Sequence, residues 1–211
     1  MIDKEMESSE LGTLEYWQDR YKTEMRNFSS HGDTGEVWFG DDVVDRIINW
    51  IRSNIPQSQS IVDVGCGNGH ILMELAQLGY ESLTGLDYSD EAIQLAKAIA
   101  GQQGLQIKYQ VNNAVEGLGS IYDVVHDKGT YDAISLSENS KDACHKYISS
   151  VKSALKENGH FLITSCNWTH SELEEQFKAF FALHTNIPTT QFKFGGKIGS
   201  VVSICVFKHS K

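Results

Sequence analysis

The sequence predicts a doubly wound α/β domain built on a mostly parallel sheet. Short apolar runs alternate with segments whose apolar residues recur at helical spacing, which is typical of this class. The first run, Ile61 to Val64, ends in the glycine-rich bend Gly65-Cys-Gly-Asn-Gly69, and the second ends in the acidic residue Asp87. A strand, a glycine bend, a helix, a second strand and an acid therefore follow one another in the order of a ligand-binding βαβ unit.

Three parts are expected along the chain. Residues 1–10 are polar and acidic and are predicted to be disordered, residues 11–55 form an N-terminal helical cap and pre-core segment, and residues 56–211 form the core of a single domain. The cap contains a predicted helix over 13–28 and a second helix, capped by Asp41 or Asp42, whose apolar face runs from Val43 to Ile51.

The core elements are predicted from periodicity and from capping residues. Ser89 is a predicted N-cap, and Thr169 with Glu172 forms a capping box. The last two strands are close together and predict a hairpin, so that one terminal strand is antiparallel. The predicted strands are 61–64, 83–86, 106–111, 121–126, 160–165, 191–194 and 200–207, and the predicted helices are 70–78, 90–100, 138–157 and 170–182.

Composition excludes several classes of protein. The net charge of −10 argues against a nucleic-acid partner, which requires a basic surface, and no apolar stretch approaches the length of a membrane span. The four cysteines are scattered and the eight histidines form no cluster with ligand spacing, so neither disulfides nor a metal site is expected. We expect a monomer in the cytoplasm, and its presence in the nucleus is compatible with the sequence.

The glycine bend predicts a cofactor that carries a ribose. Glycines let the backbone approach a ligand and leave amide N–H groups for its anionic end, and an acid after the next strand accepts hydrogen bonds from ribose hydroxyls. His70 stands where a dinucleotide site has its third glycine, and no phosphate-binding lysine follows. The alternative is that the glycines only form a turn.

The pattern Asp63-x-Gly65-x-Gly67-x-Gly69, with Asp87 downstream, resembles the first two motifs of class I S-adenosylmethionine methyltransferases. The resemblance implies a Rossmann-like, seven-stranded sheet with S-adenosylmethionine across its carboxyl edge. Asp87 would bind the ribose and Tyr88 would pack on the adenosine, although Tyr88 is equally suited to filling the core.

The third strand end supplies the predicted adenine contact. Many class I methyltransferases have an acid here, whereas this chain has Asn112 and Asn113 followed by Ala114. An amide oxygen accepts the same hydrogen bond from the adenine amine, so Asn113 is the candidate, with Ala114 beside it. The chain has no proline between residues 57 and 187, and so lacks the proline-rich motif of enzymes that methylate base amines.

A narrower resemblance covers the chain from Leu11 to Phe207. The motifs Gly32-Asp-Thr-Gly-Glu-Val-Trp-Phe-Gly40, Asp127-Lys-Gly-Thr-x-Asp132-Ala133, Ser165-Cys-Asn-Trp-Thr169 and Phe192-x-Phe-Gly-Gly196 resemble the lysine methyltransferases of translation elongation factor 1-alpha. The pair Asn112-Asn113 departs from the acidic family pattern. The resemblance implies methyl transfer to a lysine of that factor.

The resemblance also suggests roles for residues at the methyl-transfer end. Asp127 is the candidate catalytic residue and cofactor contact, unless it caps the turn with Thr130. Trp38 and Phe39 would cover the cofactor or line the lysine channel, or would only anchor the core. Asn167 and Trp168 are candidate channel residues, with Trp168 as an alternative helix start. The rival functions are a small-molecule N- or O-methyltransferase and a non-catalytic module that binds S-adenosylmethionine.

Overall fold

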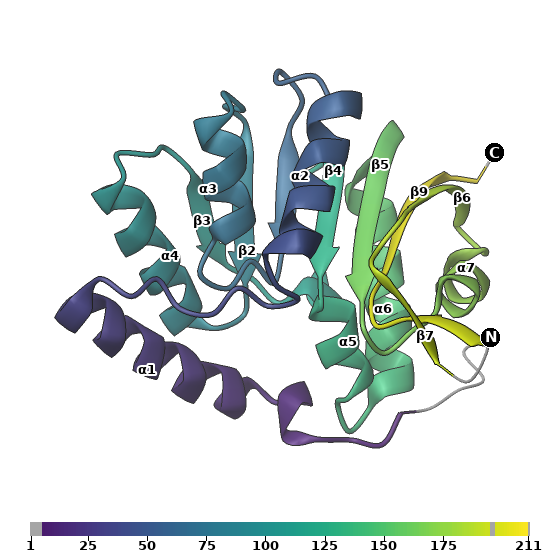
Figure 1. The fold of residues 1–211 in the computed structure, drawn as a ribbon, viewed down its shortest axis with the longest axis horizontal. Helices are drawn as coiled ribbons and strands as arrows, with labels where there is room; N and C mark the ends of the chain where they lie inside the picture. Colours follow the sequence, from purple (N-terminus) through teal and green to yellow (C-terminus); the bar gives the residue numbers. More distant parts are fainter. Residues whose placement is uncertain (1–5, 195–196, 211) are drawn as a thin grey trace.

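A seven-stranded sheet forms the centre of the protein in a computed structural model that describes residues 6–194 and 197–210 (Figure 1). Its strand order is β3-β2-β1-β4-β5-β9-β6, in which β9 runs antiparallel to both of its neighbours, β5 and β6, and the pairs from β3 to β5 are parallel. The predicted doubly wound, mostly parallel sheet is therefore confirmed. The strands are β1 (Ile61–Val64), β2 (Leu83–Asp87), β3 (Lys108–Val111), β4 (Tyr122–Lys128), β5 (Leu155–Ser165), β6 (Phe181–Ile187) and β9 (Ser203–His209).

Helices cover both faces of the sheet because successive side chains of a buried strand point to opposite faces. Along β1, Ile61 belongs to one apolar cluster, whereas Val62 and Val64 belong to the other. The first cluster includes residues of α1 (Leu14–His31), α2 (Asp41–Asn54), α3 (His70–Gln77) and α4 (Asp90–Gln102). The second includes residues of α5 (Thr130–Ser135), α6 (Ser140–Ala154) and α7 (His170–Phe177).

Helix α1 lies across the carboxyl edge of the sheet, below the ends of β1 and β2 in Figure 1. Thr13 caps it by accepting a hydrogen bond from the amide of Tyr16, and the hydroxyl of Tyr88 donates to the Thr13 carbonyl over 3.0 Å. The short helix η1 (Glu10–Gly12) precedes it. Within the described residues, no helix has both the length and the apolar character needed to cross a membrane.

The N-terminal prediction of disorder is only partly covered by the structure. Residues 1–5 lie outside the described residues. Of the remainder, Ser9 donates its amide to the Leu136 carbonyl over 3.0 Å, and Met6 packs against the second apolar cluster. This stretch thus has specific contacts with the body of the protein.

Several predicted elements differ from the structure. The helix predicted over 170–182 ends at Phe177, and 181–187 forms β6. The two end residues of β6, Phe181 and Ile187, are buried, and between them exposed and half-buried residues alternate. The antiparallel terminal strand is confirmed, but it is β9, inserted between β5 and β6. The predicted hairpin partner instead forms a separate two-stranded sheet of β7 (Gln191–Phe194) and β8 (Lys197–Ser200). The N-cap of α2 is Gly40, so the predicted caps Asp41 and Asp42 occupy the first turn.

The junction between β4 and α5 is organised by Asp127. Its carboxylate accepts hydrogen bonds from the amide of Thr130 over 2.9 Å, from the amide of Tyr131 over 3.0 Å and from the hydroxyl of Tyr147. Tyr147 belongs to α6, so one side chain joins a strand end, a helix start and a neighbouring helix. The side chain is fully buried, and burial raises the pKa of Asp127 to about 8.

We predict that Asp127→Ala lowers the free energy of unfolding by about 2–4 kcal/mol, because two amides and a hydroxyl lose their acceptor in the interior. Asp127→Asn keeps an acceptor oxygen and should lose less. Urea unfolding followed by circular dichroism measures both. The matched control is Asp142→Ala, which removes an exposed carboxylate. Equal stability of Asp127→Ala and this control would contradict the structural role.

Candidate active site

A cavity of about 340 Å³ lies at the carboxyl edge of the sheet. The ends of β1, β2, β3 and β4 form its floor, and α1 with the segment 36–39 forms its cover. This is where doubly wound sheets bind their ligands, since strands on either side of β1 lead away in opposite directions. The lining residues central to the site are Tyr21, Trp38, Phe39, Gly65, Gly67, Asn68, Asp87, Tyr88, Asn112, Asn113, Ala114, Lys128, Gly129, Thr130, Asp132, Cys166 and Asn167.

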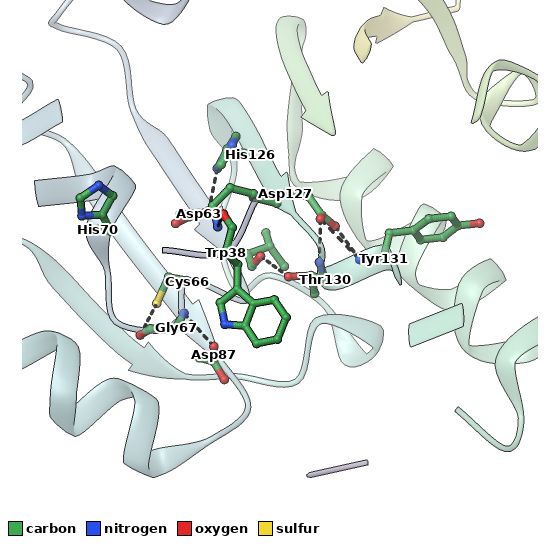
Figure 2. Close-up of polar contacts among 12 residues, drawn as sticks. Trp38, Asp63, Cys66, Gly67, His70, Asp87, His126, Asp127, Thr130 and Tyr131 are labelled. Atoms are coloured by element: carbon green, nitrogen blue, oxygen red, sulfur yellow. Dashed lines mark hydrogen bonds and ion pairs between the residues drawn. The ribbon is translucent and has the colours of Figure 1, made fainter. Parts of the chain in front are cut away.

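Asp87 ties the glycine loop to the start of α4. One carboxylate oxygen accepts from the amide of Gly67 over 3.0 Å, as Figure 2 shows, and the other accepts from the amide of Ser89 over 2.9 Å. Burial raises the pKa of Asp87 to about 6, against the opposing effect of these amides. A carboxylate has lone pairs for about four donors, so Asp87 keeps acceptor capacity for a ligand in the cavity that it lines.

The glycine loop allows close packing at the cavity floor. Gly65 and Gly67 have φ of 66° and 53°, values that favour glycine. A Cβ at Gly67 would lie 2.4 Å from the Tyr21 hydroxyl, and one at Gly65 would lie 1.9 Å from Thr130 Oγ1. Side chains at these positions would therefore displace the neighbours that shape the cavity.

The two asparagines after β3 have different hydrogen bonds. Asn113 caps the short helix η2 (Ala114–Glu116), with its side-chain oxygen 3.4 Å from the amide of Val115 and its amide group bonded to Glu116. Asn112 Oδ1 is buried and has no hydrogen-bond partner among the described residues. Both residues line the cavity. Because buried polar atoms normally have a hydrogen-bond partner, the unpartnered oxygen of Asn112 is the better acceptor for a ligand. Sequence reasoning favoured Asn113 because the unsatisfied oxygen becomes visible only in three dimensions.

The cover of the cavity is fastened from two sides. Asn68 in the glycine loop donates its side-chain amide to the carbonyls of Thr34 and Glu36, over 3.0 and 3.3 Å. Arg20 of α1 forms an ion pair with Glu36, and its guanidinium lies 6.0 Å from the centre of the Trp38 ring. The segment before α2 is thereby attached to both α1 and the cavity floor.

Asp63 lies beneath the cavity. Its carboxylate accepts a 2.7 Å hydrogen bond from His126 Nδ1, and the two residues are direct partners on β1 and β4 (Figure 2). Neither residue lines the cavity. Asp63 therefore supports the floor, and the predicted direct contact between Asp63 and a cofactor stays a prediction.

The far end of the cavity is bounded by Lys128, Phe39, Asp132 and Asn167. Lys128 Nζ donates to the Trp38 carbonyl over 3.2 Å. Burial lowers the pKa of Lys128, while the carboxylates of Asp63 and Asp127 act in the opposite direction. The cavity therefore has a lysine side chain in its wall, with its amine bound to a backbone carbonyl of the cover.

Asp132 fixes the loop after β5. It accepts from the Ser165 hydroxyl over 2.5 Å and from the amide and thiol of Cys166 over 2.8 and 3.3 Å. These donors hold Cys166 and Asn167 at the cavity wall and occupy the carboxylate. Burial raises the pKa of Asp132 above its usual range.

The structure brings most of the predicted site residues together. Nine line the cavity, namely Trp38, Phe39, Gly65, Gly67, Asp87, Tyr88, Asn113, Ala114 and Asn167. Four do not: Asp63, Gly69, Asp127 and Trp168. Gly69 makes room for the Tyr109 hydroxyl, and Trp168 is buried beside Tyr131, with ring centres 6.3 Å apart.

Asp127 has the hydrogen bonds of the helix-capping alternative that the sequence left open. Figure 2 shows its carboxylate turned toward Thr130 and Tyr131, and it has no exposed surface. Lys128 and Asn112 are cavity residues that sequence reasoning did not select. Across residues 6–194 and 197–210, no three histidine, cysteine or acidic side chains gather as a metal site.

Comparison with solved structures agrees with the fold. A TehB-like SAM-dependent methyltransferase from Corynebacterium glutamicum aligns with a TM-score of 0.65 at 19% identity, covering 92% of this chain and 98% of the other. A magnesium protoporphyrin IX methyltransferase from Synechocystis, solved with bound SAH, aligns with a TM-score of 0.64 at 15% identity, covering 93% and 98%.

Sequence relatives are closer. A methyltransferase domain family matches residues 56–200. EEF1A lysine methyltransferase 2 of Danio rerio is 43% identical over 96% of this chain and 89% of its own length, and the Homo sapiens protein of that name is 42% identical over 95% and 87%. The protein-lysine N-methyltransferase EFM4 of Saccharomyces cerevisiae is 38% identical over 96% of both chains. The chain therefore belongs to the EEF1A lysine methyltransferase 2 family of S-adenosylmethionine-dependent protein-lysine N-methyltransferases.

Proposed function

We propose that this enzyme methylates the side-chain amine of a lysine in translation elongation factor 1-alpha. The observation that carries the proposal is the cavity itself, in which a buried acid, a glycine loop and a free amide acceptor lie beside a channel end bounded by Phe39 and Asn167. The relatives that share about two-fifths of their residues with this chain are named for that substrate.

The cavity has the polar groups that S-adenosylmethionine requires. Asp87 offers acceptor positions for the two ribose hydroxyls, and the unpartnered Asn112 Oδ1 offers one for the adenine amine. Asn113 and Ala114 border the same end, and Tyr88 forms part of the wall. When bound, the cofactor supplies an electrophilic methyl group for transfer to an amine.

The acceptor end favours an uncharged lysine. A lysine amine has a pKa of about 10.4 and no lone pair while protonated. A bound sulfonium cofactor would place a like charge beside the amine, and entry into the cavity removes water from the amine, so both effects disfavour its ammonium form. The side-chain oxygen of Asn167 is suited to orient the incoming amine. Catalysis would then depend mainly on proximity and orientation.

Asp127 acts in this proposal as a positioning residue and makes no contact with the amine. Its carboxylate faces α5 and α6, and burial raises its pKa to about 8. By fixing the start of α5, it sets where Lys128, Gly129 and Thr130 meet the cavity. Asp132, which is occupied by donors from the loop after β5, has a similar supporting role.

We further propose that the enzyme acts as a cytoplasmic monomer without a nucleic-acid partner. The net charge of −10 supports this proposal, because an acidic surface repels phosphate backbones and attracts basic protein surfaces.

The proposed substrate is tested with purified elongation factor 1-alpha and labelled S-adenosylmethionine. We expect label on the factor, located at a lysine by mass spectrometry, and none with Asp87→Ala, which loses the ribose acceptor. A matched control, Asp142→Ala, removes an exposed acid that does not line the cavity and should retain activity. Wild-type protein that binds S-adenosylhomocysteine but labels only small molecules, or labels nothing, would contradict the proposal.

The raised pKa of Asp87 predicts a pH dependence of cofactor binding. The ionised carboxylate is the better acceptor for ribose hydroxyls, so affinity for S-adenosylhomocysteine should be full above about pH 6 and fall as Asp87 takes up a proton below it. Titration calorimetry between pH 5 and pH 8 measures this. Asp87→Asn should bind weakly with no such step. An unchanged step in Asp87→Asn would assign the pH dependence to another group.

The free acceptor on Asn112 predicts a specific role in adenine recognition. Asn112→Ala should weaken binding of S-adenosylhomocysteine by about tenfold, the effect of one hydrogen bond in a buried site. The analogue with an oxo group in place of the adenine amine should lose affinity for wild-type protein but little for Asn112→Ala. Asn113→Ala is the matched comparison. A larger and amine-dependent loss in Asn113→Ala would restore Asn113 as the adenine contact.

A further inference from the structure

Phe39 has a backbone conformation that side chains rarely adopt. Its φ is 70°, and it is alone among the non-glycine residues of the described ranges in having a positive value. The turn is closed by a 3.0 Å hydrogen bond from the amide of Gly40 to the carbonyl of Val37. Glycine or asparagine is the usual residue at this third position of such a turn. A bulky aromatic residue persists there only if its surroundings hold it in place.

The Phe39 ring occupies space that a glycine leaves open. A Cβ at Gly129 would lie 2.8 Å from ring atom Cε2 and 3.2 Å from Cζ, both closer than ordinary contact. Gly129 itself has φ of 88° and precedes α5 as its N-cap. The position of the ring is therefore coupled to the junction between β4 and α5.

The side chain of Lys128 forms a hydrogen bond with the backbone of the same turn. Its Nζ donates to the Trp38 carbonyl over 3.2 Å and lies 5.6 Å from the centre of the Phe39 ring. The carbonyl belongs to the peptide group that joins Trp38 to Phe39, so the hydrogen bond fixes the orientation of that peptide plane. A second attraction, between the ammonium and the aromatic face, acts on the ring that follows.

We propose that Lys128 is a positioning residue that clamps the strained Trp38–Phe39 peptide, so that both rings form one wall of the channel for the acceptor lysine. This inference rests on the proposed function. Lys128 acts through the turn and not on the reacting amine.

The direct test is Lys128→Met, which keeps the length of the side chain and removes its charge and donors. Hydrogen–deuterium exchange of peptides that cover residues 32–41 should become faster by about tenfold, because the clamp is a hydrogen bond from a charged donor. Affinity for S-adenosylhomocysteine should change little, while KM for the protein substrate rises. Lys128→Arg, which retains a charged donor, should recover part of the protection. Lys156→Met, which removes an exposed ion pair with Asp123, is the control.

A double-mutant cycle separates a clamp from general stabilisation. In Phe39→Ala protein the ring is already absent, so adding Lys128→Met should raise KM much less than it does in the wild type. Fully additive effects would overturn the proposal. Should Lys128→Met fail to fold, Phe39→Gly tests the wall by itself: a raised KM with retained cofactor affinity supports the wall, and an unchanged KM overturns it.

The exchange measurement also keeps this inference separate from the proposed substrate. Wild-type protein that fails to methylate elongation factor 1-alpha would refute the substrate but would leave the exchange of residues 32–41 interpretable. Wild-type exchange rates in folded Lys128→Met would overturn the clamp, whatever the substrate.

Discussion

The cofactor half of the site depends on one buried carboxylate. Asp87 accepts hydrogen bonds from the glycine loop after β1 and from the start of α4. It therefore connects two βα units beside the point where the strand order reverses, between β1 and β4. Burial makes the ionised form costly, which explains why its pKa is raised even though two amides stabilise it. The same arrangement leaves acceptor positions directed to the cavity. The acid is thus both a structural tie and the ribose acceptor of our proposal.

The proposed acceptor half is built from contacts between segments that are distant in the sequence. Lys128 at the end of β4 meets the Trp38 carbonyl, and Asn68 in the glycine loop meets the carbonyls of Thr34 and Glu36. Side chains at the edge of the sheet therefore hold the cover by donating hydrogen bonds to its backbone carbonyls. In our proposal the end of β4 contacts the channel wall and the end of β2 binds the ribose. Substitutions at the end of β4 are therefore expected to affect binding of the acceptor lysine more than binding of the cofactor.

Periodicity and capping chemistry were sufficient for the parallel strands of the sheet and for the residues at their carboxyl ends. The apolar runs of β1 and β2, the positive φ of Gly65 and Gly67, and the N-cap Ser89 are local features that a sequence displays. The helix α5 was missed because six residues give too little periodicity, and its start depends on Asp127 and Tyr147. The helix predicted over 170–182 ran into the first two residues of β6, and the rest of that strand was not predicted, because its alternating stretch begins soon after α7.

The orientation of individual side chains was less accessible. Asp127 stands at the strand end where the sequence predicted catalysis, yet its carboxylate is bound by Tyr147 of α6 and does not line the cavity. Asn112 and Asn113 have the same side chain, but the Asn113 oxygen caps η2 whereas the Asn112 oxygen has no partner among the described residues. The role of Lys128 depends on a partner in the N-terminal cover. Such pairings are set by tertiary packing, which spacing along the chain does not encode.

The most direct measurement is a crystal structure of the protein with S-adenosylhomocysteine. We expect both ribose hydroxyls within about 3.2 Å of the Asp87 carboxylate, as hydrogen bonds require, while that carboxylate keeps its bonds to the amides of Gly67 and Ser89. A ligand bound elsewhere, or a ribose held by other groups with Asp87 turned away, would contradict the account.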